Sequence, residues 1–112
     1  KIAVEAGKIL SSKGISAEIV DFRILSPFDP EALIKSVSKT GRLIAIDFSW
    51  KNCGFAGEIV SQACESIQPK IWKSSPKRIT LPDAPAPSSI ALERIFYPTS
   101  QEVVSVASSM II

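Results

Sequence analysis

Residues 14–47, GISAEIVDFRILSPFDPEALIKSVSKTGRLIAID, decide the fold because they predict strand, turn, helix and strand in succession. A strand is expected at residues 17–22, where apolar side chains are interleaved with acidic ones. Asp29 precedes a proline and is expected to cap the helix, and Gly41 is expected to end it in a left-handed conformation. The unbroken apolar run 43–46 is typical of a strand covered on both faces. These elements make one unit of a parallel sheet.

The segments around this unit predict helices on both sides of the sheet. An apolar stripe at the start of the chain, formed by Ile2, Ala6, Ile9 and Leu10, indicates an amphipathic helix. A second helix opens at Gly54–Gly57, after a loop at residues 48–54. Its expected core face consists of Ile59, Val60, Ala63, Cys64 and Ile67. A last strand is predicted at residues 77–81.

The final third of the chain predicts two short helices after a proline-rich segment. Residues 82–87, PDAPAP, are too rich in proline for a strand or a helix and should run extended. Ser88 or Ser89 can cap a helix at residues 90–95, whose Leu92, Ile95 and Phe96 are expected to face inward. Thr99 and Glu102 form a capping box for the last helix. That helix is expected to bury Val103, Val104, Ala107, Met110 and Ile111.

Three strands and five helical segments in mostly alternating order predict an α/β fold. The expected architecture is a three-layer α/β/α sandwich around a mostly parallel sheet. Strands and helices alternate in such folds, and this chain opens on a helix. We therefore expect residues 1–112 to be a single domain and a fragment that lacks its first strand.

Composition excludes several classes of function. The chain of 112 residues contains no histidine, so neither a Ser-His-Asp triad nor an imidazole acid–base step can be built from it. Its net charge is +2, and the densest positive stretch, Lys70 to Arg78, reads as solvated lysines and not as a nucleic-acid surface. No apolar run approaches the roughly 18 residues of a membrane span. Cys53 and Cys64 lack metal-ligand spacing and predict a reducing compartment.

The landmarks, taken in order, resemble the carboxyl-terminal domain of transketolase-like thiamine diphosphate enzymes. The resemblance is strongest to the beta subunit of the 2-oxo acid dehydrogenases that act on pyruvate, acetoin or branched-chain substrates. It rests on GISAEIVDFRILSPFD, SVSKTGRLIAID, the GFAGEI helix start, KRITLPDAPAPSS and ALERIFYP, which cover about nine-tenths of the chain.

The resemblance implies an oxidoreductase similar to acetyl-transferring pyruvate dehydrogenase, in which the cofactor carries the carbanion chemistry. Thiamine diphosphate and Mg would be held by the alpha subunit and by an amino-terminal domain of the beta subunit. No catalytic, cofactor-binding or metal-binding residue is therefore expected in these 112 residues, and the fragment alone is not expected to be catalytic. The compartment would be the bacterial cytoplasm, or the matrix of a mitochondrion or plastid.

The resemblance also implies an assembly role. The domain would help to build an α2β2 tetramer from the alpha subunit and a second beta subunit. It would also contact the subunit-binding domain of dihydrolipoyl acyltransferase, with the carboxylate of Ile112 as one contact if Ile112 is the native terminus. Relatives carry an aspartate before the last strand, whereas this sequence has Lys73, Ser74 and Ser75 there. Neither a nucleic acid nor a membrane is an expected partner.

Two alternatives stay open. The chain could be the same domain from transketolase or deoxyxylulose-phosphate synthase, although the PDAPAPSS and FYP segments favour the dehydrogenases. It could also be an independent α/β module that holds an anion at Gly54–Gly57, since backbone N–H groups at a helix start attract anions. The GFAG spacing matches no phosphate fingerprint, and close helix–sheet packing also explains the two glycines.

Overall fold

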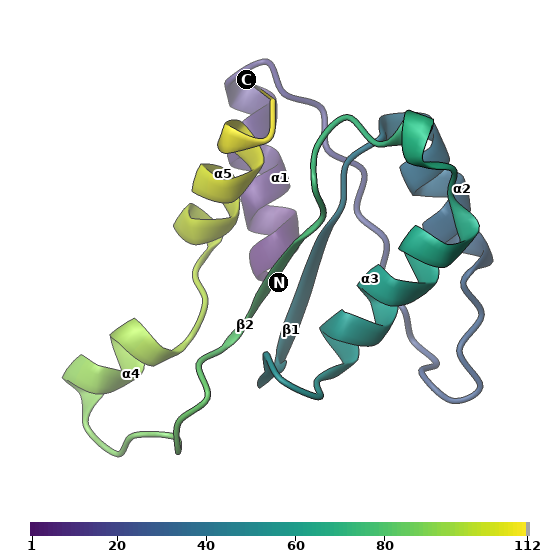
Figure 1. Ribbon diagram of the computed structural model, residues 1–112. Coiled ribbons are helices and arrows are strands. Elements are labelled where there is room, and N and C mark those ends of the chain that lie inside the picture. The colour runs from purple at the N-terminus through teal and green to yellow at the C-terminus, as the bar shows by residue number, and fades with distance from the viewer. Residues whose placement is uncertain (112) are drawn as a thin grey trace.

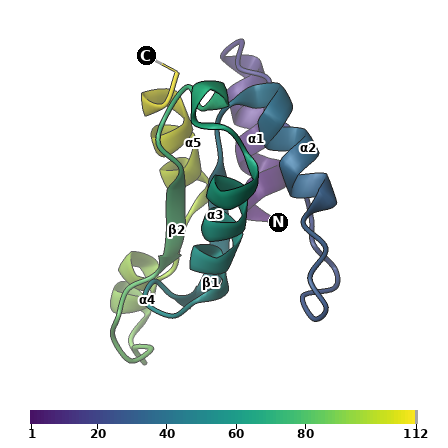
Figure 2. The same ribbon diagram turned by 45° about the vertical axis from the view of Figure 1, so that its right-hand side comes forward.

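The computed structural model describes residues 1–111. Its elements are α1 (Ile2–Ser12), α2 (Glu31–Thr40), β1 (Ile44–Trp50), α3 (Phe55–Ser66), the 3₁₀ turn η1 (Pro69–Ile71), β2 (Lys77–Leu81), α4 (Ile90–Phe96) and α5 (Ser100–Ser109). β1 and β2 run parallel to each other. Helices α1 and α5 lie on one side of the two strands, and α2 and α3 lie on the other (Figures 1 and 2). This arrangement confirms the predicted α/β/α layering.

The side chains of β1 alternate between two apolar cores, as the period of two residues in a strand requires. Ala45 belongs to the core under α2 and α3, which also contains Leu33, Val37, Ala56, Ile59, Ala63 and Ile67. Ile44 and Ile46 pack against the core under α1 and α5, which contains Ala6, Leu10, Ile79, Val103 and Val104. One short strand therefore joins both helical layers.

The predicted signals lie at both ends of α2, but the N-cap position is Pro30, one residue after the predicted Asp29. The Asp29 carboxylate accepts a hydrogen bond of 3.0 Å from the backbone N–H of Glu31, the first residue of the helix. At the other end Gly41 has a φ of 72°, a left-handed conformation. A Cβ atom on Gly41 would lie 2.7 Å from the carbonyl oxygen of Ile71, so the turn requires glycine.

The prediction of a strand at residues 17–22 is wrong for the described structure. This segment is irregular, and no backbone–backbone hydrogen bond within residues 1–111 involves it. It is held by side chains instead: the Glu18 carboxylate accepts a hydrogen bond of 2.9 Å from Ser36 and lies 3.8 Å from the Lys39 ammonium. A strand needs a ladder partner, and β1 pairs only with β2 in the described part of the chain.

One strand boundary and one helix face also differ from the predictions. Residues 48–50, expected in a loop, extend β1, because Trp50 pairs with Leu81 beyond an irregularity in the register. Cys64, expected in the core, is exposed. Each residue turns a helix by about 100°, and Cys64 therefore points away from the face on which Ala63 is buried.

The last third of the chain follows its local signals but not all of its predicted burial. Pro82–Pro87 forms neither helix nor strand, as predicted. Phe96, Val103, Val104 and Met110 are buried, whereas Leu92, Ile95 and Ile111, also predicted inside, are 56%, 82% and 46% exposed. None of the helices in residues 1–111 is both long and apolar enough to cross a membrane.

Candidate functional site

A carboxylate of the chain itself accepts a hydrogen bond from the backbone at the start of α3. The Asp47 side chain, near the end of β1, accepts a hydrogen bond of 3.2 Å from the backbone N–H of Ala56 and another from the Ser49 hydroxyl. Gly54 lies so close to β1 that a Cβ atom there would collide with the carbonyl oxygen of Trp50. The glycine thus serves close packing, and Asp47 takes the position in which an external anion would be stabilised.

The residues described around the end of β1 and the start of α3 do not form a metal or cofactor site. No group of three His, Cys, Asp or Glu side chains within residues 1–111 is arranged to hold a metal ion. Cys53 and Cys64 are both free and exposed. Arg78, part of the basic stretch, donates a hydrogen bond of 2.8 Å to the carbonyl oxygen of Lys51 and so braces the loop after β1. These residues do not fit the diphosphate–metal group of a thiamine enzyme.

The most unusual surface of the described chain is formed by α4. Ile90, Leu92 and Ile95, which we call the α4 surface, are 70%, 56% and 82% exposed. Figure 1 shows why: α4 stands away from the two strands, beyond the end of β2 and the proline-rich segment. The helix itself is well formed, since the Ser89 hydroxyl accepts a hydrogen bond of 3.2 Å from the N–H of Leu92. Several large apolar side chains on one short exposed helix mark an interaction surface.

Aromatic side chains connect the α4 surface to the end of the sheet. Phe48, in β1, stacks on Tyr97 with the ring centroids 6.1 Å apart, and Tyr97 packs edge-on against Phe96. Phe48 and Trp50 are both more than half exposed. Aromatic residues supply large contact areas in protein interfaces, so this group extends the candidate docking surface from α4 to β1.

Sequence reasoning assigned Leu92 and Ile95 to the core and therefore missed this surface. The available signal was the proline-rich segment, which carries α4 away from the sheet. The only residue predicted to bind a partner, Ile112, lies outside the described residues. The helix before it is anchored, because the Arg42 guanidinium donates a hydrogen bond of 2.9 Å to the carbonyl oxygen of Met110. Lys73 and Ser75, at the place where the resemblance implies an aspartate, are exposed.

Fold and surface together define an α/β domain whose α4 surface leaves large apolar side chains exposed. The model of the family described as "Transketolase, C-terminal domain" matches residues 1–103, and the chain belongs to this family. This result agrees with the resemblance found from the motifs.

Curated relatives refine the comparison. The chain is 38% identical to the beta subunit of acetoin:2,6-dichlorophenolindophenol oxidoreductase from Bacillus subtilis, over 97% of this chain and 32% of the relative. It is 33% identical to the mitochondrial beta subunit of the pyruvate dehydrogenase E1 component from Saccharomyces cerevisiae, over 99% of this chain and 31% of the relative. The chain thus spans about a third of the length of the curated relatives it matches.

Proposed function

We propose that residues 1–112 are the assembly and partner-binding domain at the carboxyl end of the beta subunit of a 2-oxo acid dehydrogenase. The parent enzyme would be an oxidoreductase that decarboxylates pyruvate or a similar 2-oxo acid. Similarity to beta subunits of pyruvate and acetoin enzymes along nearly the whole chain supports this assignment. The α4 surface is the structural observation that carries the assembly role.

The parent enzyme would use thiamine diphosphate and Mg, which supply the electron sink for decarboxylation. The described residues do not fit that group, so we place its site in an amino-terminal domain and in the alpha subunit. The contribution of this chain would be structural. It would hold the subunits together, and the cofactor site between them would be formed by other residues. Its compartment would be the bacterial cytoplasm, or an organelle matrix in a eukaryote.

The partners would be an alpha subunit and a second beta subunit in an α2β2 tetramer. The α4 surface and the aromatic group around Phe48 would be covered by one of them. Burial of each large aliphatic side chain stabilises an assembly by about 1.5–3 kcal/mol when it is complete. The exposed fractions of Ile90 and Ile95 leave most of that gain available for association.

The assembly role is tested by placing a charge on the α4 surface of the full-length beta subunit, co-expressed with its alpha subunit. Ile95→Asp should reduce the fraction of tetramer at micromolar concentration at least tenfold, as measured by light scattering after gel filtration. Ile24→Asp is the matched control, since Ile24 is 68% exposed in the loop before α2. Equal tetramer fractions for the two variants would remove the α4 surface from the interface.

A second experiment tests the chain terminus. Adding residues after Ile112 in the full-length protein should weaken binding of the acyltransferase subunit-binding domain, because it displaces the carboxylate proposed to face cationic side chains. Isothermal titration calorimetry at low salt measures this effect, and the unextended protein is the reference. Unchanged affinity would exclude Ile112 from the contact. Assays of the tetramer with pyruvate and with acetoin would identify the substrate class.

A further inference from the structure

The charges of this domain are polarised along its strands. The first turns of α2, α3 and α5 contain Glu31, Glu58 and Glu102. These helices run antiparallel to the strands, so their first turns lie toward the edge of the sheet at which β1 and β2 end (Figure 1). Carboxylates are stabilised at the N-termini of helices, and the helices themselves therefore account for the acidic character of this edge.

Basic residues gather at the opposite edge, where the strands begin. The four lysines that we call the basic edge, all exposed, are Lys39, Lys70, Lys73 and Lys77. They come from α2, from η1, from the loop after η1 and from the start of β2. Tertiary contacts join these segments: the N–H of Lys73 donates a hydrogen bond of 2.8 Å to the carbonyl oxygen of Gly41, and the N–H of Lys77 donates one of 3.0 Å to that of Leu43.

The dipoles of the helices do not account for the basic edge. The carboxyl ends of α1, α2, α3 and α5 all lie toward it, but among these helices only α2 has a basic residue, Lys39, in its last turn. The stabilisation of a cation by a helix C-terminus falls off within that turn. Lysines 70, 73 and 77 therefore need another explanation.

Ion pairs within the domain do not supply that explanation. Within residues 1–111 the one ion pair joins Lys39 to Glu18, at 3.8 Å, so the ammonium groups of lysines 70, 73 and 77 have no carboxylate partner there. Like charges that a fold brings together repel one another and lower its stability. A carboxylate supplied from outside the domain would remove this repulsion.

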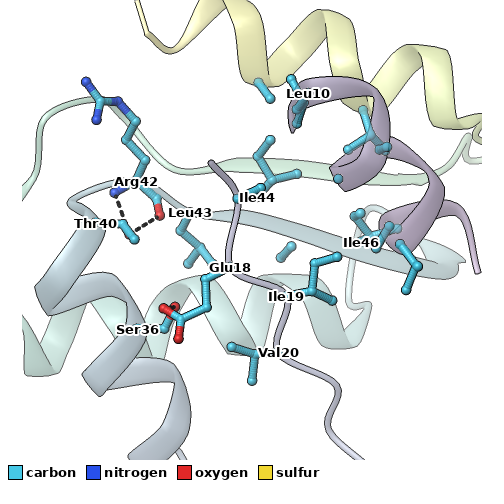
Figure 3. Close-up of a pocket in the computed structure, with 18 of the residues that line it drawn as sticks. Leu10, Glu18, Ile19, Val20, Ser36, Thr40, Arg42, Leu43, Ile44 and Ile46 are labelled. Atoms are coloured by element: carbon cyan, nitrogen blue, oxygen red, sulfur yellow. Dashed lines mark hydrogen bonds between the residues drawn. The ribbon is translucent and has the colours of Figure 1, made fainter. Parts of the chain in front are cut away.

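Hydrogen bonds fix the backbone that carries the basic edge. The Thr40 hydroxyl donates a bond of 3.1 Å to the carbonyl oxygen of Arg42 (Figure 3), and the Arg42 guanidinium donates one of 2.9 Å to the carbonyl oxygen of Met110. The side chain of Lys73 packs on this turn, since its Cγ atom lies 2.9 Å from the position of a Cβ atom on Gly41. A lysine whose methylene stem is already held loses less conformational entropy when its ammonium group binds a ligand.

The chemistry of the basic edge favours carboxylates on a polypeptide. Phosphate groups are read best by the planar fork of arginine, and the guanidinium of Arg42, beside the edge, already donates to Met110. Ile71 and Trp72, which lie between the lysines, are half-buried against the core under α2 and α3. Neither is therefore free to stack on a nucleobase or to enter a membrane.

We propose that the basic edge is a docking surface for an acidic segment of a partner polypeptide. Contacts between exposed lysines and carboxylates steer association and set orientation, and they weaken as salt is added. The contact proposed for Ile112 has the opposite sign, because there a carboxylate of this chain would face cations. The inference therefore goes beyond the proposed function, and it rests on the charges of the described residues alone.

Titration of the natural full-length protein with a fluorescein-labelled oligoglutamate peptide of about ten residues tests the proposal. Fluorescence anisotropy should show saturable binding at about 20 mM sodium chloride, and the affinity should fall at least tenfold at about 500 mM because the charges are screened. An oligolysine peptide of the same length should not bind at this surface. Absence of oligoglutamate binding at low salt would overturn the proposal.

A pair of variants with the same change in charge locates the binding. Lys73→Glu should weaken binding of the peptide at least fivefold, whereas Lys73→Arg, which keeps the charge, and Lys51→Glu, in the exposed loop at the other end of the strands, should each change it by less than about twofold. Equal losses for Lys73→Glu and Lys51→Glu would show that only net charge matters and would contradict the proposal. Tighter binding of duplex DNA or of phosphatidylserine vesicles, also weakened by Lys73→Glu, would contradict it as well.

Discussion

Helices α4 and α5 carry similar local signals but have opposite environments. Each begins with a hydroxyl cap: Ser89 accepts a hydrogen bond from the N–H of Leu92, and Thr99 accepts one from the N–H of Glu102, both 3.2 Å long. Yet α5 packs against α1 and buries Val103 and Val104, whereas α4 leaves most of its aliphatic side chains in solvent. The difference teaches that caps and apolar spacing specify a helix but do not specify what covers it.

The largest expected contrast comes from a charge on each helix. Val104→Asp should destabilise the protein by about 3–5 kcal/mol, because it leaves an uncompensated charge in the core under α1 and α5. Ile95→Asp should change the free energy of unfolding by less than about 0.5 kcal/mol, as surface substitutions usually do. Urea denaturation of the two variants measures both values. Similar losses would mean that α4 is buried in the free chain.

A milder contrast uses truncation of apolar side chains. Met110→Ala should cost about 2–5 kcal/mol, since the thioether side chain is 95% removed from solvent and truncation leaves a cavity. Leu92→Ala on α4 should cost only a few tenths of a kcal/mol while the partner is absent. Thermal unfolding monitored by circular dichroism gives both effects. A small effect of Met110→Ala would show that the end of α5 contributes little to the core.

The smallest contrast concerns the two caps. Thr99→Ala should lower the free energy of global unfolding by about 1 kcal/mol, because it removes a capping hydrogen bond from a helix that packs into the core. Ser89→Ala removes the same bond from α4, but we expect its cost to appear as local opening of α4. Amide exchange within residues 90–96, measured beside global unfolding, separates the two. A full kcal/mol of global destabilisation by Ser89→Ala would contradict the comparison.

Agreement between sequence and structure is best where the signal is local. The Asp29 acceptor at the start of α2, the left-handed Gly41, strand 77–81 and the capping position of Thr99 were all predicted, because each depends on a few neighbouring atoms. The prediction failed at residues 17–22, because a strand needs a ladder partner and the described chain offers none there. It also failed at Leu92 and Ile95, because spacing indicates an apolar face without showing whether any surface meets it.

The candidate site was predicted less well than the fold for the same reason. Motif order was sufficient to recognise the family, since it reflects the sequence directly, and Ile112 remains a prediction. The α4 surface became visible only in three dimensions. The sequence alone determined which segments form helices, where these are capped, and to which family the chain belongs, because those properties follow from neighbouring residues. Only the tertiary structure decided which apolar side chains are covered, because burial depends on the distances between segments that are remote in the chain.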